Sequence, residues 1–379
     1  MSKARELAEL GAVYDSGALS NRNLIINGAT QVAQRGTSST GLGTAEGYFT
    51  VDRFKTSVGS TTAGRFTMTQ ESDGPSALSG IANSIKLACT TADTSIAAGE
   101  NMRIVYVIEG QDLQRLKKGT SSAESFTISF YVKGNAAATY ICEVYDLDNT
   151  RHVGKTFNVT TDWNRIELTF PADTTGAITD DATGGIQITF WLHSGTTYTS
   201  GTLPATWAAV SNANRAGGLS TSFYDSTSRT FFLSGLQMEV GTEATPFEHR
   251  SFGDELLRCQ RYYQETSNAT NYSMVGDGTC QSSVVSILFD YLCEMRTSPS
   301  VSALGTNGSS SWYIQSGSTT ISTASSAFNG AWAAGTNSQR AWMDWTGISG
   351  QTASNTAAVY RNNQLTSNKN GCLAFDAEL

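Results

Sequence analysis

The chain has 379 residues, of which 39% are hydrophobic and 15% charged, and its formal net charge is −8. This length exceeds most single hydrophobic cores and suits two domains, while the hydrophobic content excludes general disorder. No run of basic residues is longer than Lys117-Lys118. Electrostatics therefore exclude a nucleic-acid or anionic-membrane partner, and no apolar run is long enough to insert into a membrane as a helix.

Residues 1–20 stand apart from the rest of the chain. The spacing of Leu7 and Leu10 predicts a short amphipathic helix that ends at Gly11. A helix of this length is not stable alone and needs a surface to bind. We therefore expect residues 1–20 to be a docking peptide anchored by Leu7 and Leu10.

Residues 21–250 are expected to form one antiparallel jelly-roll β-sandwich. Apolar residues recur with a period of two, as in Ile128, Phe130 and Val132, which is the pattern of a half-buried strand. The expected strands are 48–58, 64–71, 84–89, 102–109, 125–133, 138–146, 163–170, 185–193 and 229–240. Nine strands with one helical turn, at 110–119, fit a jelly roll. The long polar segment 194–228 is expected to be a surface loop.

A short helix is expected over residues 254–263, where apolar residues recur at helical spacing. These residues are Leu256, Leu257, Cys259, Tyr262 and Tyr263. We assign residues 251–269 to a helical connector and expect Leu256, Leu257 and Tyr262 to lie at an interface between subunits.

Residues 270–379 alternate again and predict a second, smaller β-sandwich. Its expected strands are 270–275, 281–290, 311–315, 340–345, 357–360 and 371–376. The sequence thus predicts an all-β chain whose jelly roll is followed by a short helix and a second sandwich.

Two groups of residues resemble a signature of bacteriophage tail-fibre and related virion appendage proteins. The first is NRNLIING at 21–28, followed by QRG at 34–36 and DRF at 52–54. The second is MEVGTEATPFE at 238–248, followed by ELLRCQRYY at 255–263. Residues 129–134 and 162–165 also resemble a carbohydrate-binding-type jelly roll. These matched segments, called the signature motifs below, together bracket about two thirds of the chain.

The resemblance implies a homotrimeric virion protein that is made in the host cytoplasm. It also implies that residues 1–20 dock on other virion proteins while the β-domains reach a host-surface glycan. A decoration or joining protein that binds only virion proteins is the alternative, and a fibre-borne glycan hydrolase is the third. We interpret the motif residues Asn27, Arg35, Asp52 and Arg53 as structural, through a strand end, a turn and an Arg–Asp contact.

No catalytic residue is expected. None of the three histidines lies in a nucleophile motif, so we interpret them as ordinary strand or surface residues; they are His152, His193 and His249. Four aspartates could cap turns, bind calcium or pair for glycosidase chemistry; they are Asp146, Asp148, Asp180 and Asp181. No cofactor is expected, with a structural calcium left open.

Aromatic residues in polar loops are the best candidates for sugar binding, because their rings pack on the C–H faces of sugars. We select Trp207, Trp332 and Arg361 as candidate contacts with a glycan or a protein partner. Trp207 could instead anchor its own loop. Trp342 and Trp345 lie in expected strands, where core or subunit contacts are the alternative.

The six cysteines contain no C-x-x-C pair and lie mostly in apolar surroundings. We interpret them as small buried hydrophobic residues of a protein made in a reducing cytosol.

Overall fold

The computed structural model describes residues 3, 21–266, 274–281, 284–304, 312–316, 319–322, 327–331, 336–346, 355–361 and 372–379. Leu7, Leu10 and Trp332 therefore lie outside the described residues. The chain divides into two compact units, residues 1–256 with Leu379 and residues 257–378. The finer division into four parts stays a prediction. No helix in the described part of the chain is long and apolar enough to cross a membrane.

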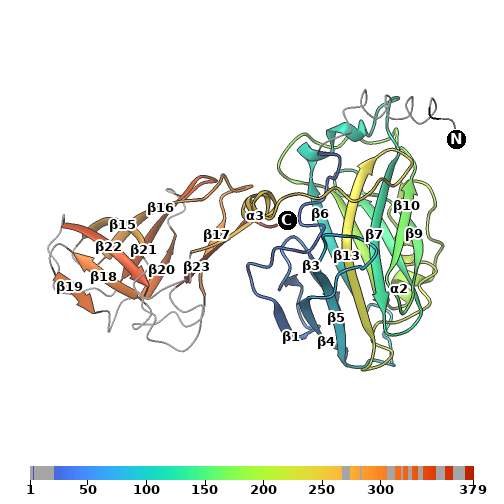
Figure 1. The fold of residues 1–379 in the computed structure, drawn as a ribbon, viewed down its shortest axis with the longest axis horizontal. Coiled ribbons are helices and arrows are strands. Elements are labelled where there is room, and N and C mark those ends of the chain that lie inside the picture. The colour runs from blue at the N-terminus through green and yellow to red at the C-terminus, as the bar shows by residue number, and fades with distance from the viewer. Residues whose placement is uncertain are drawn as a thin grey trace. The chain divides into compact units, whose positions relative to one another are not determined.

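The first unit is a sandwich of two antiparallel sheets (Figure 1). Sheet A has the order β1-β4-β5-β13-β7-β10. Its strands are β1 (Ser38–Leu42), β4 (Arg65–Glu71), β5 (Ser84–Thr91), β13 (Thr230–Val240), β7 (Phe126–Gly134) and β10 (Asn164–Phe170). This arrangement confirms the antiparallel jelly-roll sandwich expected from the sequence.

Sheet B is the facing layer and has the order β12-β9-β8-β11-β6-β3-β2. Its strands are β12 (Ala208–Ala209), β9 (Arg151–Val159), β8 (Ala138–Asp146), β11 (Gly184–Ser194), β6 (Asn101–Glu109), β3 (Lys55–Gly59) and β2 (Gly47–Tyr48). A 3₁₀ helix, η1 (Gly110–Leu116), follows β6 and ends at Lys117, which adopts the left-handed conformation.

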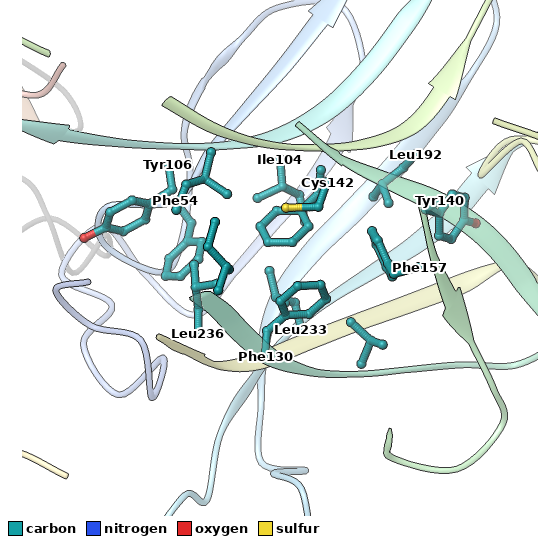
Figure 2. Packing of buried hydrophobic residues seen from close by; sticks show 14 of the residues in the cluster. Phe54, Ile104, Tyr106, Phe130, Tyr140, Cys142, Phe157, Leu192, Leu233 and Leu236 are labelled. Atoms are coloured by element: carbon teal, nitrogen blue, oxygen red, sulfur yellow. The ribbon is translucent and has the colours of Figure 1, made fainter. Parts of the chain in front are cut away.

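The core of the first unit forms where the apolar faces of sheets A and B meet. Figure 2 shows Ile104, Cys142 and Leu192 of sheet B directed toward Phe130 and Leu233 of sheet A. Aromatic rings join the two layers, and the ring centroids of Phe130 and Phe190 lie 5.0 Å apart in an edge-to-face arrangement. These core residues occupy every second position of their strands, as the period of two requires.

Main-chain hydrogen bonds between the two groups of signature motifs hold the first and last segments of this sandwich together. Leu24 N donates to Met238 O at 2.9 Å and Leu236 N donates to Gly28 O at 3.0 Å. The strand that ends at Val240 therefore lies beside the segment after Asn23. Gly28 is required here, because a Cβ at this position would lie 2.0 Å from Leu236 O.

The second unit is a smaller sandwich, as expected, with two antiparallel sheets. Sheet C has the order β14-β23-β17 and sheet D the order β19-β18-β22-β15-β16-β21-β20. The bounds are β14 (Tyr263–Glu265), β15 (Met274–Gln281), β16 (Val284–Asp290), β17 (Ser300–Leu304), β18 (Trp312–Ser316), β19 (Thr319–Ser322), β20 (Ala327–Ala331), β21 (Arg340–Thr346), β22 (Asn355–Arg361) and β23 (Cys372–Asp376). Phe289 of sheet D stacks on Phe375 of sheet C, with ring centroids 4.8 Å apart.

The helix α3 spans Phe252–Gln260, so the expected helix over residues 254–263 extends three residues too far. Tyr262 N donates to Cys259 O in a turn, and Tyr263 then begins strand β14. Pairing of Tyr263 with Asp376 outweighs the helical spacing of the two tyrosines. Five of the six cysteines are buried, which agrees with their interpretation as small apolar residues.

Candidate functional site

The side of sheet B that faces away from sheet A carries polar and aromatic residues in the middle of apolar strands. Trp191 lies opposite Arg103 on β6 and Ile141 on β8, and Thr189 lies opposite Glu143 on β8. Directly opposed residues of neighbouring strands share a face of the sheet. We call this surface the outer face of sheet B and define it by Arg103, Val105, Ile141, Glu143, Tyr145, Gln187, Thr189 and Trp191.

Glu143 is the buried centre of this face. Its carboxylate accepts hydrogen bonds from Trp191 Nε1 at 2.8 Å and from Arg215 Nε and Nη2 at 2.9 and 3.0 Å. It also shares a 2.9 Å hydrogen bond with His152 Nδ1. Burial acts to raise the pKa of Glu143, but the hydrogen bonds from His152, Arg215 and Trp191 and the Arg215 charge hold that pKa below its ordinary value. The carboxylate is therefore ionised at neutral pH.

Arg215 belongs to a loop that crosses part of the outer face. This loop, residues 195–219, is called the strap loop and contains α2 (Thr196–Thr199) and η2 (Asn212–Asn214). The Arg215 guanidinium lies 5.0 Å from the Tyr145 ring centroid and 5.2 Å from that of Trp191. Tyr198, Leu203, Ala216 and Leu219 of the strap loop pack in one cluster with Ile141 and Trp191. The loop therefore buries Trp191 completely.

Arg103 is a second cation against the same indole ring, with its guanidinium carbon 4.8 Å from the Trp191 centroid. Its Nη2 donates to Ser57 Oγ at 2.8 Å. Burial, and then the charge of Arg215, hold the pKa of Arg103 below its usual value. Arg103, Tyr145 and Gln187 are partly exposed on the outer face, whereas Ile141, Glu143, Thr189 and Trp191 are buried. The exposed part thus combines a ring, an amide group and a guanidinium donor, which is a chemistry suited to binding a hydroxylated ring.

No binding site was predicted from the sequence on this face. A signal for it was present, because Arg103 and Glu143 are charged residues in the interior of largely apolar strands, NMRIVYVIE and ATYICEVYD, whose other charged residue stands at the strand end. A charged side chain on the outward side of a buried strand needs a polar or oppositely charged partner. The partner of Glu143 is Arg215, 72 residues away in a loop, and no local pattern connects the two.

Trp207 anchors the loop that carries it, which was the alternative raised from the sequence. Its Nε1 donates to Pro171 O at 2.8 Å. Lys118 Nζ lies 5.1 Å from the ring centroid, and the ring packs partly buried against the core of the first unit. A role for Trp207 in glycan binding stays a prediction.

The other predicted contact residues lie in the second unit. Arg361 ends β22, where its main chain pairs with Trp312, and its side chain lies outside the described part. Trp345 is buried against Trp312 with ring centroids 5.3 Å apart, so it is a core residue, as the alternative stated. Trp342 is 37% exposed.

The residues expected at a subunit interface differ in exposure. Leu257 is 51% exposed and Leu256 is half-buried, whereas Tyr262 is buried within the chain. Of the three residues, Leu256 and Leu257 therefore present surface to a partner. The interface itself stays a prediction.

A lysine occupies the position where Asp146 could have bound calcium. Lys118 Nζ donates to Asp146 and to the main-chain oxygens of Thr175 and Gly176 at 3.0 Å, and it lies 3.1 Å from Asp173 Oδ2. Two carboxylates and two carbonyls are the donor set of a calcium site. Since an ammonium group already fills this set of oxygens, the residues at Asp146 do not fit a metal ion.

The other three of these aspartates either accept a main-chain hydrogen bond in a turn or are exposed to solvent. Asp148 Oδ2 accepts Thr179 N at 2.8 Å and Asp181 Oδ1 accepts Thr183 N at 2.8 Å, while Asp180 is exposed. Within the described residues, no group of three or more His, Cys, Asp or Glu side chains is placed to hold a metal ion.

The other histidines also occupy structural positions. His193 is buried, and burial holds its pKa below the ordinary value. Its Nδ1 lies 2.8 Å from Ser222 Oγ, which also accepts the main-chain N–H of Tyr224 at 3.0 Å. The Ser222 hydroxyl therefore caps a turn. His249 is exposed beside the ring of Phe247.

The residues of the N-terminal signature motifs hold the local main chain in place through hydrogen bonds. Asn27 has φ of 59°, donates to the main-chain oxygens of Val32 and Asp52 and accepts Val32 N. Asp52 Oδ1 accepts Gln34 N at 2.9 Å, and Arg53 Nη2 donates to Val107 O at 2.7 Å. These contacts agree with a structural role.

A set of exposed and partly buried polar contacts joins these motifs to the second signature group. Glu248 accepts the main-chain N–H groups of Asn21 and Asn23 at 2.6 and 2.7 Å. Arg250 donates to the main-chain oxygens of Asn23 and Ile25, and it pairs with Glu255 at 3.2 Å. We call Asn23, Glu248, Arg250 and Glu255 the signature clamp. It fastens the start of the first unit to the start of α3.

Comparison with solved structures gives weak matches. No family model matches the chain, and no curated protein matches it. The enzymatically active domain of tailspike protein 4 from bacteriophage CBA120 aligns at 12% identity and a TM-score of 0.30, over 58% of this chain and 22% of that chain.

Two carbohydrate-binding modules align at a similar level. The family 11 module of Clostridium thermocellum, in complex with a mixed-linked tetrasaccharide, has 14% identity and a TM-score of 0.27, over 55% of this chain and 99% of its own. TmCBM61, in complex with β-1,4-galactotriose, has 10% identity and a TM-score of 0.28, over 59% of this chain and 100% of its own. At these TM-scores the matches say nothing about function. The fold assignment comes from the strand pairing of the chain itself.

Proposed function

We propose that this chain is a non-enzymatic bacteriophage virion protein, a homotrimeric tail-fibre or appendage subunit. Residues 1–20 dock it on other virion proteins, and its β-sandwiches attach the particle to a host-surface glycan. The observation that carries the proposal is the outer face of sheet B. There, Tyr145, Gln187 and Arg103 bring ring, amide and guanidinium groups together on a rigid sheet.

The signature clamp supports the appendage architecture. Glu248 and Arg250 hold the main chain of residues 21–25 beside the segment that leads into α3. The peptide that precedes Asn21 and the segment that follows Glu255 therefore depart from neighbouring points on one rigid sandwich. This arrangement suits a subunit that is held by one end of its chain while the other end carries a further domain.

A glycan array with the full-length protein tests the glycan-binding part of the proposal. We expect binding to a restricted set of host-surface glycans, weakened by Gln187→Ala and by Tyr198→Ala. Asn158→Ala is a matched control. Asn158 is exposed in β9 of the same sheet and pairs with Thr139, away from Tyr145 and Gln187. Binding that is absent, or unchanged in both variants, would contradict this use of the face.

Truncation tests the docking part. We expect deletion of residues 2–18 to leave a soluble, folded oligomer that no longer joins the particle. Replacing Trp332 or Arg361 with Ala should leave assembly intact and weaken attachment to cells. Normal particle assembly without residues 2–18 would contradict the docking role.

The alternative is a decoration or joining protein that binds only other virion proteins. Exposed apolar side chains favour it, since Phe252, Leu257 and Leu292 are 55, 51 and 66% exposed. An empty glycan array together with stable binding to another virion protein would select this alternative. A product assay on host envelope polysaccharide tests the third function, glycan hydrolysis, and we expect no product.

A further inference from the structure

We infer that the outer face of sheet B selects glycans that carry a carboxylate, such as uronic or sialic acid residues, over their neutral counterparts. This inference rests on the proposed glycan binding and names the class of sugar that the same face prefers. The observation behind it is that Arg103 is a partly buried cation without an anionic partner on a face whose other charges are paired.

Arg103 retains unused hydrogen-bond donors. Its Nε is buried and has no hydrogen-bond partner, whereas Nη2 is held by Ser57 Oγ. Within the described residues, no carboxylate lies within 4.0 Å of its guanidinium, and Nη1 makes no hydrogen bond. Because Nε is enclosed by protein, a ligand reaches Arg103 through Nη1, a donor that is not buried. A carboxylate that accepts from Nη1 gains a hydrogen bond to a charged donor.

The carboxylates nearest to Arg103 are already used. Glu143 is held by Arg215, Trp191 and His152. Glu46 accepts from Lys55 Nζ at 2.9 Å and from Ser57 Oγ at 3.0 Å. Arg215 and Lys55 therefore each have a carboxylate on this face, and Arg103 is left as the uncompensated positive charge.

The position of Arg103 suits recognition of a planar anion. Trp191 and Ser57 hold the guanidinium in place from two sides, so little side-chain freedom is lost when a ligand binds. A guanidinium presents parallel N–H donors that match the two oxygens of a carboxylate. Gln187, which is partly exposed on the same face, offers an amide group for sugar hydroxyls.

Long-range electrostatics do not supply this preference. The whole chain has a formal net charge of −8, which disfavours an acidic ligand at a distance. Selectivity for an acidic sugar must therefore come from a local contact, and it must depend on one residue more than on the overall charge.

Matched oligosaccharide pairs test the inference: 3′-sialyllactose with lactose, and trigalacturonate with galactotriose. Isothermal titration of the full-length oligomer should show that the acidic member of at least one pair binds about tenfold to a hundredfold more tightly, as expected for hydrogen bonds to a charged group. Arg103→Gln should remove the difference within the pair. Arg103→Lys should leave a smaller preference, because a lysine keeps the charge and loses the planar fork.

Lys117→Gln is the matched control, since it removes one exposed positive charge from a different element. It should leave the preference unchanged. Equal binding of acidic and neutral members, or a preference that survives in Arg103→Gln, would overturn the inference while leaving glycan binding standing. If Arg103→Gln does not fold, an unchanged preference in Arg103→Lys overturns it. Absence of binding to every sugar on a broad array would overturn the proposed function and this inference together.

Discussion

Two buried charged side chains of the first unit are Glu143, in the middle of strand β8, and Lys118, in the turn that follows η1. Glu143 is tolerated because four hydrogen bonds satisfy its carboxylate, and Lys118 is tolerated because four oxygens surround its ammonium group. Buried charges of this kind are costly when one partner is removed. Two predictions follow from these two residues.

The first prediction concerns the pH dependence of stability. The pKa of Glu143 in the folded protein lies below its ordinary value of 4.5. The stabilisation from its ionised form is therefore present above pH 4.5 and is lost as the pH falls through the folded-state pKa. Glu143→Gln should lower the free energy of unfolding at pH 7 and give a shallower loss of stability between pH 5 and pH 3 than the unsubstituted protein. Denaturant titrations across this range measure both effects, and parallel curves would contradict the assignment.

The second prediction concerns Lys118. Lys118→Met leaves Asp146 without this cation, in a site where both side chains are at most 4% exposed. The free energy of unfolding should fall by about 3–5 kcal/mol, measured by denaturant titration. Lys117→Met changes an exposed neighbouring lysine and should cost no more than about 1 kcal/mol. Equal losses of unfolding free energy in the two variants would show that the buried ion pair contributes no more to stability than the exposed lysine does.

At the scale of elements, the sequence predicts most strands well because their apolar residues alternate. The expected strands at 138–146 and 163–170 correspond to β8 (Ala138–Asp146) and β10 (Asn164–Phe170). Strand β9 was missed because Arg151–Val159 mixes His152, Gly154 and Lys155 with its apolar residues. His152 lies on the side of sheet B that faces away from the core, whereas Lys155 lies on the core side, with its ammonium 5.8 Å from the ring centroid of Phe170. A single sequence does not reveal this arrangement.

The candidate site could not be predicted in the same way. It combines residues of β6, β8 and β11 with Arg215 of the strap loop, and these segments meet only through sheet pairing. The sequence analysis favoured aromatic residues in polar loops. Trp191 was overlooked because it lies inside a strand, where a tryptophan is more often a core residue.

A third prediction tests the contact between the two signature groups. Gly28→Ala would bring a Cβ within 2.0 Å of Leu236 O, a main-chain atom that cannot move without breaking β13. The variant should be strongly destabilised or fail to fold. Gly253→Ala is the control, because nothing lies within 4 Å of its added Cβ and it is in helix α3. That substitution should stabilise the protein by up to about 1 kcal/mol. Comparable melting temperatures for both variants would contradict the close contact.

At the scale of the whole molecule, the fourth prediction concerns assembly. The protein should be a trimer in solution at micromolar concentration, as mass measurement by light scattering can show. Leu257 is 51% exposed on α3, so a charged residue there should be tolerated by a monomer. Leu257→Asp should therefore dissociate the trimer if this residue lies at the subunit interface. A clean monomer of the unsubstituted protein would contradict the assembly.

The central claim is that a glycan binds the outer face of sheet B. Hydrogen exchange of the full-length oligomer, with and without a glycan selected from the array, tests it most directly. We expect slower exchange in β6, β8 and β11 and in the strap loop, residues 195–219, with no change in β15 and β16 of the second unit. Protection confined to the second unit, or no protection anywhere at a saturating glycan concentration, would contradict it.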